Sequence, residues 1–280
     1  MKIGILGAGT MGCGIAQAFA AVEGYSVVIC DISLDLARKG VEKIGKKLDK
    51  ALEKGRMEES AAQKIRSSIC AGEYADLSGC ALIIEAALED MQVKKALFQE
   101  LSAVCGPETL FATNTSSLSI TDICNGLDRP LIGMHFFNPA ETMKLVEVIP
   151  GLNTPDAVVE TACGIAAAIG KTPVVVRDAA GFVVNRLLIP MINEAVAVFA
   201  EGVASAEDID AAMKLGAGHP MGPLALGDLV GLDVCLAIMQ VLHSEIGEDK
   251  YRPHPLLRKM VRGGRLGRKS GRGFFDYPAR

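Results

Sequence analysis

A histidine and an acid in two successive apolar runs could together carry acid–base chemistry. His135 lies in the run 131–137, and Glu147 lies in the next run, 144–149. Histidine changes its charge near neutral pH, so His135 could take the proton from a hydroxyl group while hydride leaves the same carbon. An unpaired buried carboxylate is costly, so Glu147 needs a partner. If the two runs form neighbouring strands, Glu147 could accept a hydrogen bond from one ring nitrogen and fix the tautomer of the base.

Other interpretations of these residues stay open at this point. A histidine in an apolar run is by default structural, and His135 is favoured because Glu147 and a dinucleotide motif accompany it. A hydrolytic site with Ser116 is conceivable, but the sequence has no G-x-S-x-G motif. The remaining histidines lie among helices or prolines and are interpreted as structural: His219, His243 and His254.

A glycine-rich turn after the first apolar run is typical of a dinucleotide site. The segment Gly7-Ala8-Gly9-Thr10-Met11-Gly12 follows the run 3–6 and opens into a helix of small residues. Gly7 would make the tight turn, Gly9 would let the backbone approach a pyrophosphate, and Gly12 would let the helix pack on the sheet. The helix N-terminus would offer its N–H groups to the phosphates. An ordinary strand-to-helix junction is the alternative.

An acid at the end of the second apolar run indicates which dinucleotide binds. Asp31 follows the run 26–30 and lies nineteen residues after Gly12. A carboxylate at this position can hold both ribose hydroxyls, and it would repel a 2′-phosphate. We therefore expect NAD rather than NADP as the cofactor.

Length, charge and cysteine usage limit the class of protein. The 280 residues favour one large α/β domain and a smaller one, and the net charge of −4 gives no case for nucleic acid or an anionic membrane. Eight scattered cysteines without a C-x-x-C motif indicate a reducing, cytoplasmic compartment and no metal site. Met1 leads directly into the first strand, which leaves no room for a signal peptide. Polar and charged residues within the apolar stretch 182–200 disfavour a membrane span.

Apolar runs alternate with helical patterns through residues 1–180, which predicts a parallel, doubly wound α/β sheet of the Rossmann type. Ser33 is a candidate N-cap for a helix that ends near Gly55, and a second helix would fold back on it, forming a helical-hairpin arm over about 34–70. The other predicted strands are 81–87, 109–114, 131–137, 144–149 and 172–176, and the other predicted helices are 91–104 and 155–169.

Charged residues near the sheet edge and on the arm have two interpretations each. Glu89 and Lys94 follow the strand 81–87 at the edge where such sheets bind ligands, but a loop acid and a surface lysine are the alternative. The lysine stripe on the first arm helix is usually a solvated face. The more specific alternative is a binding site for a polyanionic part of a substrate, with Lys50 and Lys54 as the expected contacts.

The chain beyond a candidate linker at 178–181 is predicted to be helical. This gives a first domain of residues 1–180 and a smaller all-α domain of residues 181–280. The helix 182–200 is apolar nearly all round, which indicates burial against the first domain and a second subunit. The tail 265–277 is glycine-rich and basic and should be a loop. The other predicted helices are 206–215, 223–246 and 255–261.

Five segments resemble the 3-hydroxyacyl-CoA dehydrogenase family over essentially the whole chain. The resemblance is greatest to its stand-alone bacterial branch of butyrate and butanol fermentation. It implies reversible NAD-dependent oxidation of a short (S)-3-hydroxyacyl-CoA, here 3-hydroxybutyryl-CoA to acetoacetyl-CoA. It also implies a homodimer through the helical domain. The segments are 114–121, 133–139, 143–148, 181–186 and 219–223.

The same resemblance implies roles for individual residues. His135 would be the general acid and base, Glu147 its orienting acid, and Ser116 and Asn185 the groups that hold the substrate's oxygens. Coenzyme A would contact the lysine-rich arm. Cofactor contacts would come from Gly7, Gly9, Thr10, Met11, Gly12, Asp31, Glu89, Lys94, Asn114, Ser116, Asn138 and Lys269.

Two rival functions remain at this stage. A two-domain dehydrogenase of a free β-hydroxy acid would not need the basic arm, so removing Lys50 and Lys54 would leave its substrate affinity unaltered. A family member kept as a nucleotide-binding or structural protein would retain the fold without turnover. The presence of all four proposed catalytic residues argues against the second rival: Ser116, His135, Glu147 and Asn185.

Overall fold

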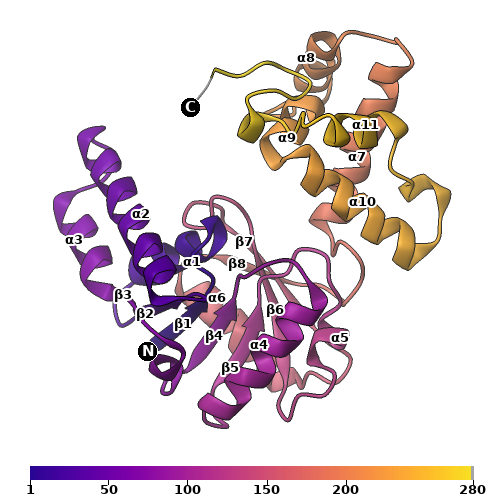
Figure 1. Ribbon diagram of the computed structural model, residues 1–280. Coiled ribbons are helices and arrows are strands. Elements are labelled where there is room, and N and C mark those ends of the chain that lie inside the picture. The colour runs from indigo at the N-terminus through magenta and orange to yellow at the C-terminus, as the bar shows by residue number, and fades with distance from the viewer. Residues whose placement is uncertain (279–280) are drawn as a thin grey trace. The chain divides into compact units, whose positions relative to one another are not determined.

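The computed structural model describes residues 1–278 (Figure 1). The chain divides into two compact units, one of residues Met1–Asp178 and one that begins at Ala179. The first contains the sheet and the second is helical.

The first unit is built on an eight-stranded sheet with the order β3-β2-β1-β4-β5-β6-β7-β8. Neighbouring strands are parallel apart from β6 and β7, which are antiparallel. The sheet is parallel and doubly wound as the sequence predicted, except at this one pair, where the connection 137–144 is too short for a crossover helix. The strands are β1 Lys2–Leu6, β2 Ser26–Cys30, β3 Ile69–Ala71, β4 Leu82–Glu85, β5 Leu110–Thr113, β6 Leu131–Phe136, β7 Leu145–Pro150 and β8 Thr172–Val175.

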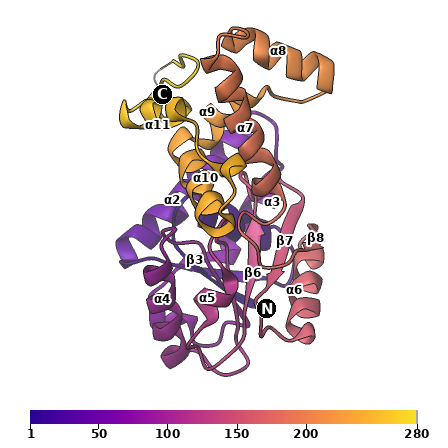
Figure 2. The ribbon, with the colours of Figure 1, turned by 90° about the vertical axis from the view of Figure 1, so that its right-hand side faces the viewer.

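Helices cover both faces of this sheet, with α4 and α5 on one face and α6 on the other (Figure 2). Ser33 caps α2 by accepting from Leu36 N–H, and Gly55 follows its end with φ +61°, as the sequence predicted. The helices are α1 Thr10–Ala20, α2 Leu34–Glu53, α3 Glu59–Ser68, α4 Met91–Val104, α5 Ile120–Cys124 and α6 Asp156–Ala168, with a short 3-10 helix at Tyr74–Leu77.

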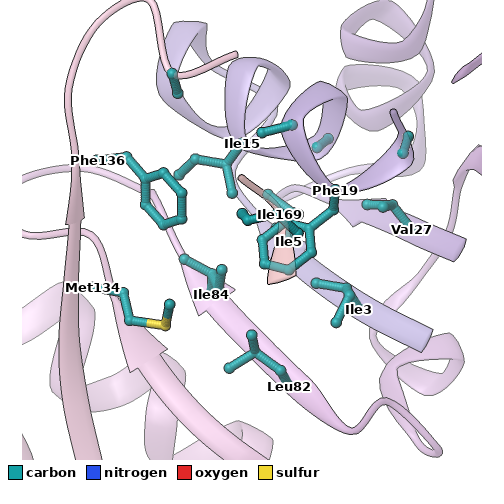
Figure 3. Packing of buried hydrophobic residues seen from close by; sticks show 14 of the residues in the cluster. Ile3, Ile5, Ile15, Phe19, Val27, Leu82, Ile84, Met134, Phe136 and Ile169 are labelled. Atoms are coloured by element: carbon teal, nitrogen blue, oxygen red, sulfur yellow. The ribbon is translucent and has the colours of Figure 1, made fainter. Parts of the chain in front are cut away.

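Strand residues alternate between the two faces. Ile84 and Met134 belong to the core shared with Ile15 and Phe19 of α1 (Figure 3). Because successive strand side chains point to opposite faces, the residues next to them, such as His135, point to the face covered by α4 and α5. Burial of strand residues on both faces is what a doubly covered sheet requires.

The second unit consists of five helices and two 3-10 helices within the described residues. Its core is apolar and includes Ile192, Leu224 and Met239. The single helix predicted over 223–246 is wrong, because Gly231 adopts φ +105° and the chain bends by 96° between α9 and α10. The elements are α7 Val184–Ala200, α8 Ala206–Ala217, α9 Pro223–Val230, α10 Leu232–Ile246, η2 Asp249–Tyr251, α11 Pro255–Arg262 and η3 Arg268–Ser270.

Among residues 1–278, no single helix has the length and apolarity needed to cross a membrane, and α9 with α10 meets that test only as a bent pair.

Candidate active site

The glycine turn between β1 and α1 has space for a phosphate group. Gly7 adopts φ +100°, and a Cβ added at Gly12 would lie 1.8 Å from the Gly7 carbonyl oxygen, so neither position accepts a side chain. A Cβ added at Gly9 would meet no described atom within 4 Å, which leaves open space above the turn. Thr10 and Met11 begin α1, so their N–H groups belong to the helix N-terminus. These features fit a dinucleotide pyrophosphate.

Asp31 stands at the next strand end and braces the glycine turn. Its Oδ2 accepts a hydrogen bond of 2.7 Å from Ala8 N–H, and its Oδ1 accepts one from Ile32 N–H. The turn is also joined to β2, because Gly7 N–H donates to the Cys30 carbonyl at 2.8 Å. The carboxylate is thus held beside the turn, where the acid of a dinucleotide site binds the ribose.

His135 and Glu147 face each other across β6 and β7. Their Cα atoms are register partners, and His135 Nδ1 lies 2.8 Å from Glu147 Oε2. Both side chains are buried, with 6% and 1% of their residue surfaces exposed. The His135 ring also packs against Phe137 at a centroid distance of 4.4 Å. A buried carboxylate on Nδ1 favours the tautomer with its proton on that nitrogen, which leaves Nε2 as the basic atom.

Asn114 connects the carboxyl ends of β5 and β6. Its Oδ1 accepts a hydrogen bond of 2.8 Å from Phe136 N–H, directly after His135. Its own N–H donates to the Glu85 carbonyl at 2.7 Å, which links it to β4 as well. Asn114 therefore fixes the strand end that carries the histidine.

Glu89 accepts several hydrogen bonds from the loop that carries Ser116. One oxygen, Oε1, accepts from the Thr115 hydroxyl at 2.6 Å and from the N–H groups of Ser116 and Ser117 at 2.8 and 3.2 Å. The Ser116 hydroxyl also donates to it, at 3.1 Å. Burial alone would raise the pKa of Glu89, but the Lys94 charge and the hydrogen bonds from Thr115 and Ser116 hold that pKa below its ordinary value. Glu89 is therefore a carboxylate at neutral pH.

Lys94 is buried on α4 rather than exposed on the surface of the helix. Its Nζ lies 2.7 Å from Glu85 Oε1 and 3.3 Å from Glu89 Oε2. Sequence reasoning missed Glu85, which is fully buried at the end of β4 and also accepts from the Thr113 hydroxyl at 2.6 Å. The signal that selected Glu147, an acid with apolar neighbours on both sides, is present at Glu85 too.

The turn between β6 and β7 carries Asn138. It is held in place by Lys171, a second residue that sequence reasoning missed. Asn138 is exposed and joined to Pro139 by a cis peptide bond. The buried Lys171 donates to the carbonyl oxygens of Ala140 and Met143 at 2.7 and 2.8 Å. Its ammonium therefore holds the segment that connects the strands of the His135–Glu147 pair.

The loop after Ser116 is held by the last residue of the first unit. Asp178 accepts hydrogen bonds from the Ser119 hydroxyl at 2.9 Å and from the N–H groups of Ile120 and Thr121 at 3.1 and 2.8 Å. These contacts satisfy the N-terminus of α5.

The remaining predicted site residues lie on the arm and in the second unit. Lys50 and Lys54 are exposed at the C-terminal end of α2, and Lys47 one turn earlier forms an ion pair with Glu141. In the second unit, Asn185 lies in the first turn of α7, and Lys269 in η3 forms an ion pair with Asp233 on α10. Within residues 1–278, no group of three or more His, Cys, Asp or Glu side chains is placed to hold a metal ion.

A doubly wound sheet with a glycine turn and an acid after its second strand is typical of a dinucleotide-binding protein, and the buried His–Glu pair at the same edge supplies the acid–base group that a nicotinamide oxidoreductase needs. Two family models match the chain. The 3-hydroxyacyl-CoA dehydrogenase NAD-binding domain covers residues 2–179, and the C-terminal domain of the same family covers residues 181–277.

Individual relatives agree with the family models. The chain is 52% identical to the 3-hydroxybutyryl-CoA dehydrogenase of Clostridioides difficile, with 99% of each chain covered. It is 49% identical to a probable 3-hydroxybutyryl-CoA dehydrogenase of Bacillus subtilis, with 99% and 97% covered. The crystal structure of (S)-3-hydroxybutyryl-CoA dehydrogenase from Ralstonia eutropha superposes with a TM-score of 0.93 at 46% identity, with 99% of each chain covered.

The chain belongs to the 3-hydroxyacyl-CoA dehydrogenase family. The predicted family, the α/β architecture followed by a helical domain, and NAD as the cofactor are confirmed.

Proposed function

We propose that this protein catalyses the reversible, NAD-dependent oxidation of (S)-3-hydroxybutyryl-CoA to acetoacetyl-CoA. The observation that carries the proposal is the buried contact between His135 Nδ1 and Glu147 Oε2, at the same edge of the sheet as the glycine turn. The names of relatives about 50% identical over their full length support the C4 substrate.

His135 is the proposed acid and base of the reaction. Bound NAD supplies the hydride acceptor. Nε2 of His135 takes the hydroxyl proton during oxidation and returns it during reduction, while Glu147 holds Nδ1 and stabilises the imidazolium. Ser116 and Asn185 are proposed to hold the reacting and thioester oxygens, with Asn185 assigned by its sequence motif alone.

The cofactor contacts are proposed for the residues around the glycine turn and the strand ends. The turn 7–12 would receive the pyrophosphate, and Asp31 the adenosine ribose. Glu89, Asn114 and Ser116 would contact the nicotinamide half of the cofactor. Lys94 would contribute through its ion pair with Glu89. Asn138 and Lys269 are further proposed contacts, the latter assigned by resemblance.

Replacing the base tests the proposed mechanism. His135→Gln should retain NADH binding and lower kcat for acetoacetyl-CoA reduction by about 10²–10⁴-fold, the usual contribution of a general acid or base. His243→Gln, which changes a histidine in the last turn of α10, is the matched control and should keep its turnover. Unchanged turnover in His135→Gln would refute the assignment of the base.

The lysine-rich end of α2 is the proposed contact for coenzyme A, whose phosphates are polyanionic. Lys50→Ala with Lys54→Ala should raise KM for acetoacetyl-CoA several-fold, and the increase should shrink at high salt because exposed charges are screened. Lys259→Ala, an exposed lysine on α11, serves as the control. An unaltered KM in the double variant would favour the rival substrate, a free β-hydroxy acid.

We further propose a cytoplasmic homodimer in which residues 1–180 bind NAD and residues 181–280 bind substrate and form the dimer interface. Large apolar side chains exposed on the helical unit, such as Leu187 and Val203, support the interface. An apolar pocket of about 450 Å³ between α7 and α8 lies within the same unit. All eight cysteines are free, which agrees with a reducing compartment.

A further inference from the structure

Three charged side chains, Glu85, Glu89 and Lys94, form a cluster of ion pairs at the carboxyl end of β4. Glu85 and Lys94 are fully buried, and Glu89 is 37% exposed at its side chain. Two carboxylates share one ammonium, so the cluster carries one negative charge in excess. Solvent and salt screen the buried pair weakly and Glu89 more strongly, but a charge at the surface still acts on a group that binds in direct contact with it.

The ammonium of Lys94 is nearer to Glu85 than to Glu89. The two distances are 2.7 Å and 3.3 Å, and the first contact is completely desolvated. Glu85 is held in place for this contact, because its Oε1 also accepts from Ala87 N–H at 2.7 Å and its Oε2 accepts from the Thr113 hydroxyl. Since Lys94 is engaged by the buried acid, the excess negative charge falls on Glu89, the member that reaches the surface.

The strand order locates Glu89 relative to a bound dinucleotide. Asp31 follows β2, the glycine turn follows β1, Glu89 follows β4 and His135 ends β6, in the spatial order β2-β1-β4-β5-β6. In this fold the acid after β2 holds the adenosine ribose and the turn after β1 holds the pyrophosphate. The other half of the cofactor, with the nicotinamide, must then extend over β4 and β5 toward His135.

We propose that Glu85 is a positioning residue that acts through Lys94: by engaging the ammonium it leaves Glu89 negatively charged, which raises the affinity of the site for oxidised NAD relative to its affinity for NADH. The nicotinamide ring is cationic when oxidised and neutral when reduced, so a negative charge beside it distinguishes the two forms. The inference rests on the NAD-dependent function proposed above. It adds that Glu85 sets the affinity for NAD⁺ relative to that for NADH.

Glu85→Gln tests this role without removing the side chain's volume. Lys94 then pairs with Glu89 alone, the cluster becomes neutral, and the ratio Kd(NAD⁺)/Kd(NADH) should rise by about tenfold, which corresponds to about 1.4 kcal/mol. Both dissociation constants are measured by titration of the full-length protein, with NADH fluorescence for NADH and calorimetry for NAD⁺. A ratio equal to that of the wild type would overturn the proposal.

Two further variants separate charge from structure. Thr113→Val removes a hydrogen bond to Glu85 and one from Thr115 N–H but no charge, so it must leave the ratio of the two dissociation constants unaltered. Glu85→Gln with Lys94→Met restores the single negative charge on Glu89, because it removes the ammonium that neutralises Glu89 in Glu85→Gln. Its ratio should return to within about twofold of the wild type. If this double variant shows the raised ratio, or if the loss in Glu85→Gln is equal for both redox forms, the role of Glu85 is structural.

The test does not depend on turnover. Wild-type protein that binds NADH but does not reduce acetoacetyl-CoA would contradict the proposed function and still give the affinity ratio. Wild-type turnover together with an unmoved ratio in Glu85→Gln would contradict this inference alone. The double variant also covers the case in which Glu85→Gln alone is too unstable to purify, because it removes the buried ammonium together with the buried carboxylate.

Discussion

His135 and Glu147 are register partners in the antiparallel pair formed by β6 and β7. Side chains directly opposite each other in such a pair point to the same face and are close enough to interact. The eight residues between the two strands therefore do more than reverse the chain, because a slip of one residue would turn Glu147 to the opposite face. The hydrogen bond between the two side chains depends on this register.

Glu147→Gln should lower kcat far more than it weakens NADH binding. An amide can donate to Nδ1, which would stabilise the wrong tautomer and place the proton on Nε2, as happens when the acid of a Ser–His–Asp triad is made an amide. We expect a fall of at least about 10²-fold in acetoacetyl-CoA reduction, followed at 340 nm. Glu160→Gln, at an exposed position on α6, should retain full activity. Equal activity of the two variants would remove Glu147 from the mechanism.

Substitutions at two glycines of the turn should affect cofactor binding and stability differently. Gly9→Ala should keep the melting temperature of the wild type, because its Cβ meets no described atom within 4 Å, but should weaken NADH binding by about tenfold or more, since the methyl group occupies the phosphate space. Gly12→Ala should lower the melting temperature as well, because its Cβ would lie 1.8 Å from the Gly7 oxygen. Tight NADH binding by Gly9→Ala would place the pyrophosphate elsewhere.

Glu89 should make stability depend on pH in the acid range. Its pKa is lower in the folded protein than the ordinary 4.5, so the carboxylate form stabilises the fold. This contribution is fully present above the unfolded pKa and is lost as the pH falls through the folded pKa. The difference in melting temperature between the wild type and Glu89→Gln should therefore be largest at pH 6 to 7 and shrink below about pH 4.5. A difference that grows on acidification contradicts the assignment.

The helical unit should determine the oligomeric state. Val203 is 68% exposed and lines the apolar pocket between α7 and α8, so Val203→Asp should place a charge in the proposed interface. Light scattering after gel filtration should give twice the chain mass for the wild type and the mass of one chain for the variant. Leu152→Asp, at an apolar residue of the first unit that is even more exposed, at 82%, should leave the mass unchanged. A monomeric wild type would refute the proposed dimer.

The sequence predicted the parts of the fold that have a local cause. Ser33 and Gly55 mark the ends of α2 because a cap and a left-handed glycine act within a few residues. The break at Gly231 was missed, since a glycine in a helical pattern shows its positive φ only when tertiary packing demands it. The antiparallel β7 was missed because strand direction follows from the length of a connection rather than from any residue.

The candidate site was predictable where residue type and position both carry information. Glu147 could be selected because an acid in an apolar run needs a partner. Lys94 could be named but not its burial, because the acid that draws it inward, Glu85, comes from another element. Lys171 gave no signal at all, since its partners are backbone carbonyls of a turn thirty residues earlier in the chain.

Asp178 fixes where the protein can be divided. As the final residue of the first unit, it binds the N-terminus of α5 by three hydrogen bonds and so completes the loop that begins at Ser116. A fragment that stops at residue 177 would leave that helix end unsatisfied, whereas one that ends a few residues later would keep it. Any separate expression of the NAD-binding half, or any insertion meant to lengthen the linker, therefore belongs after this aspartate.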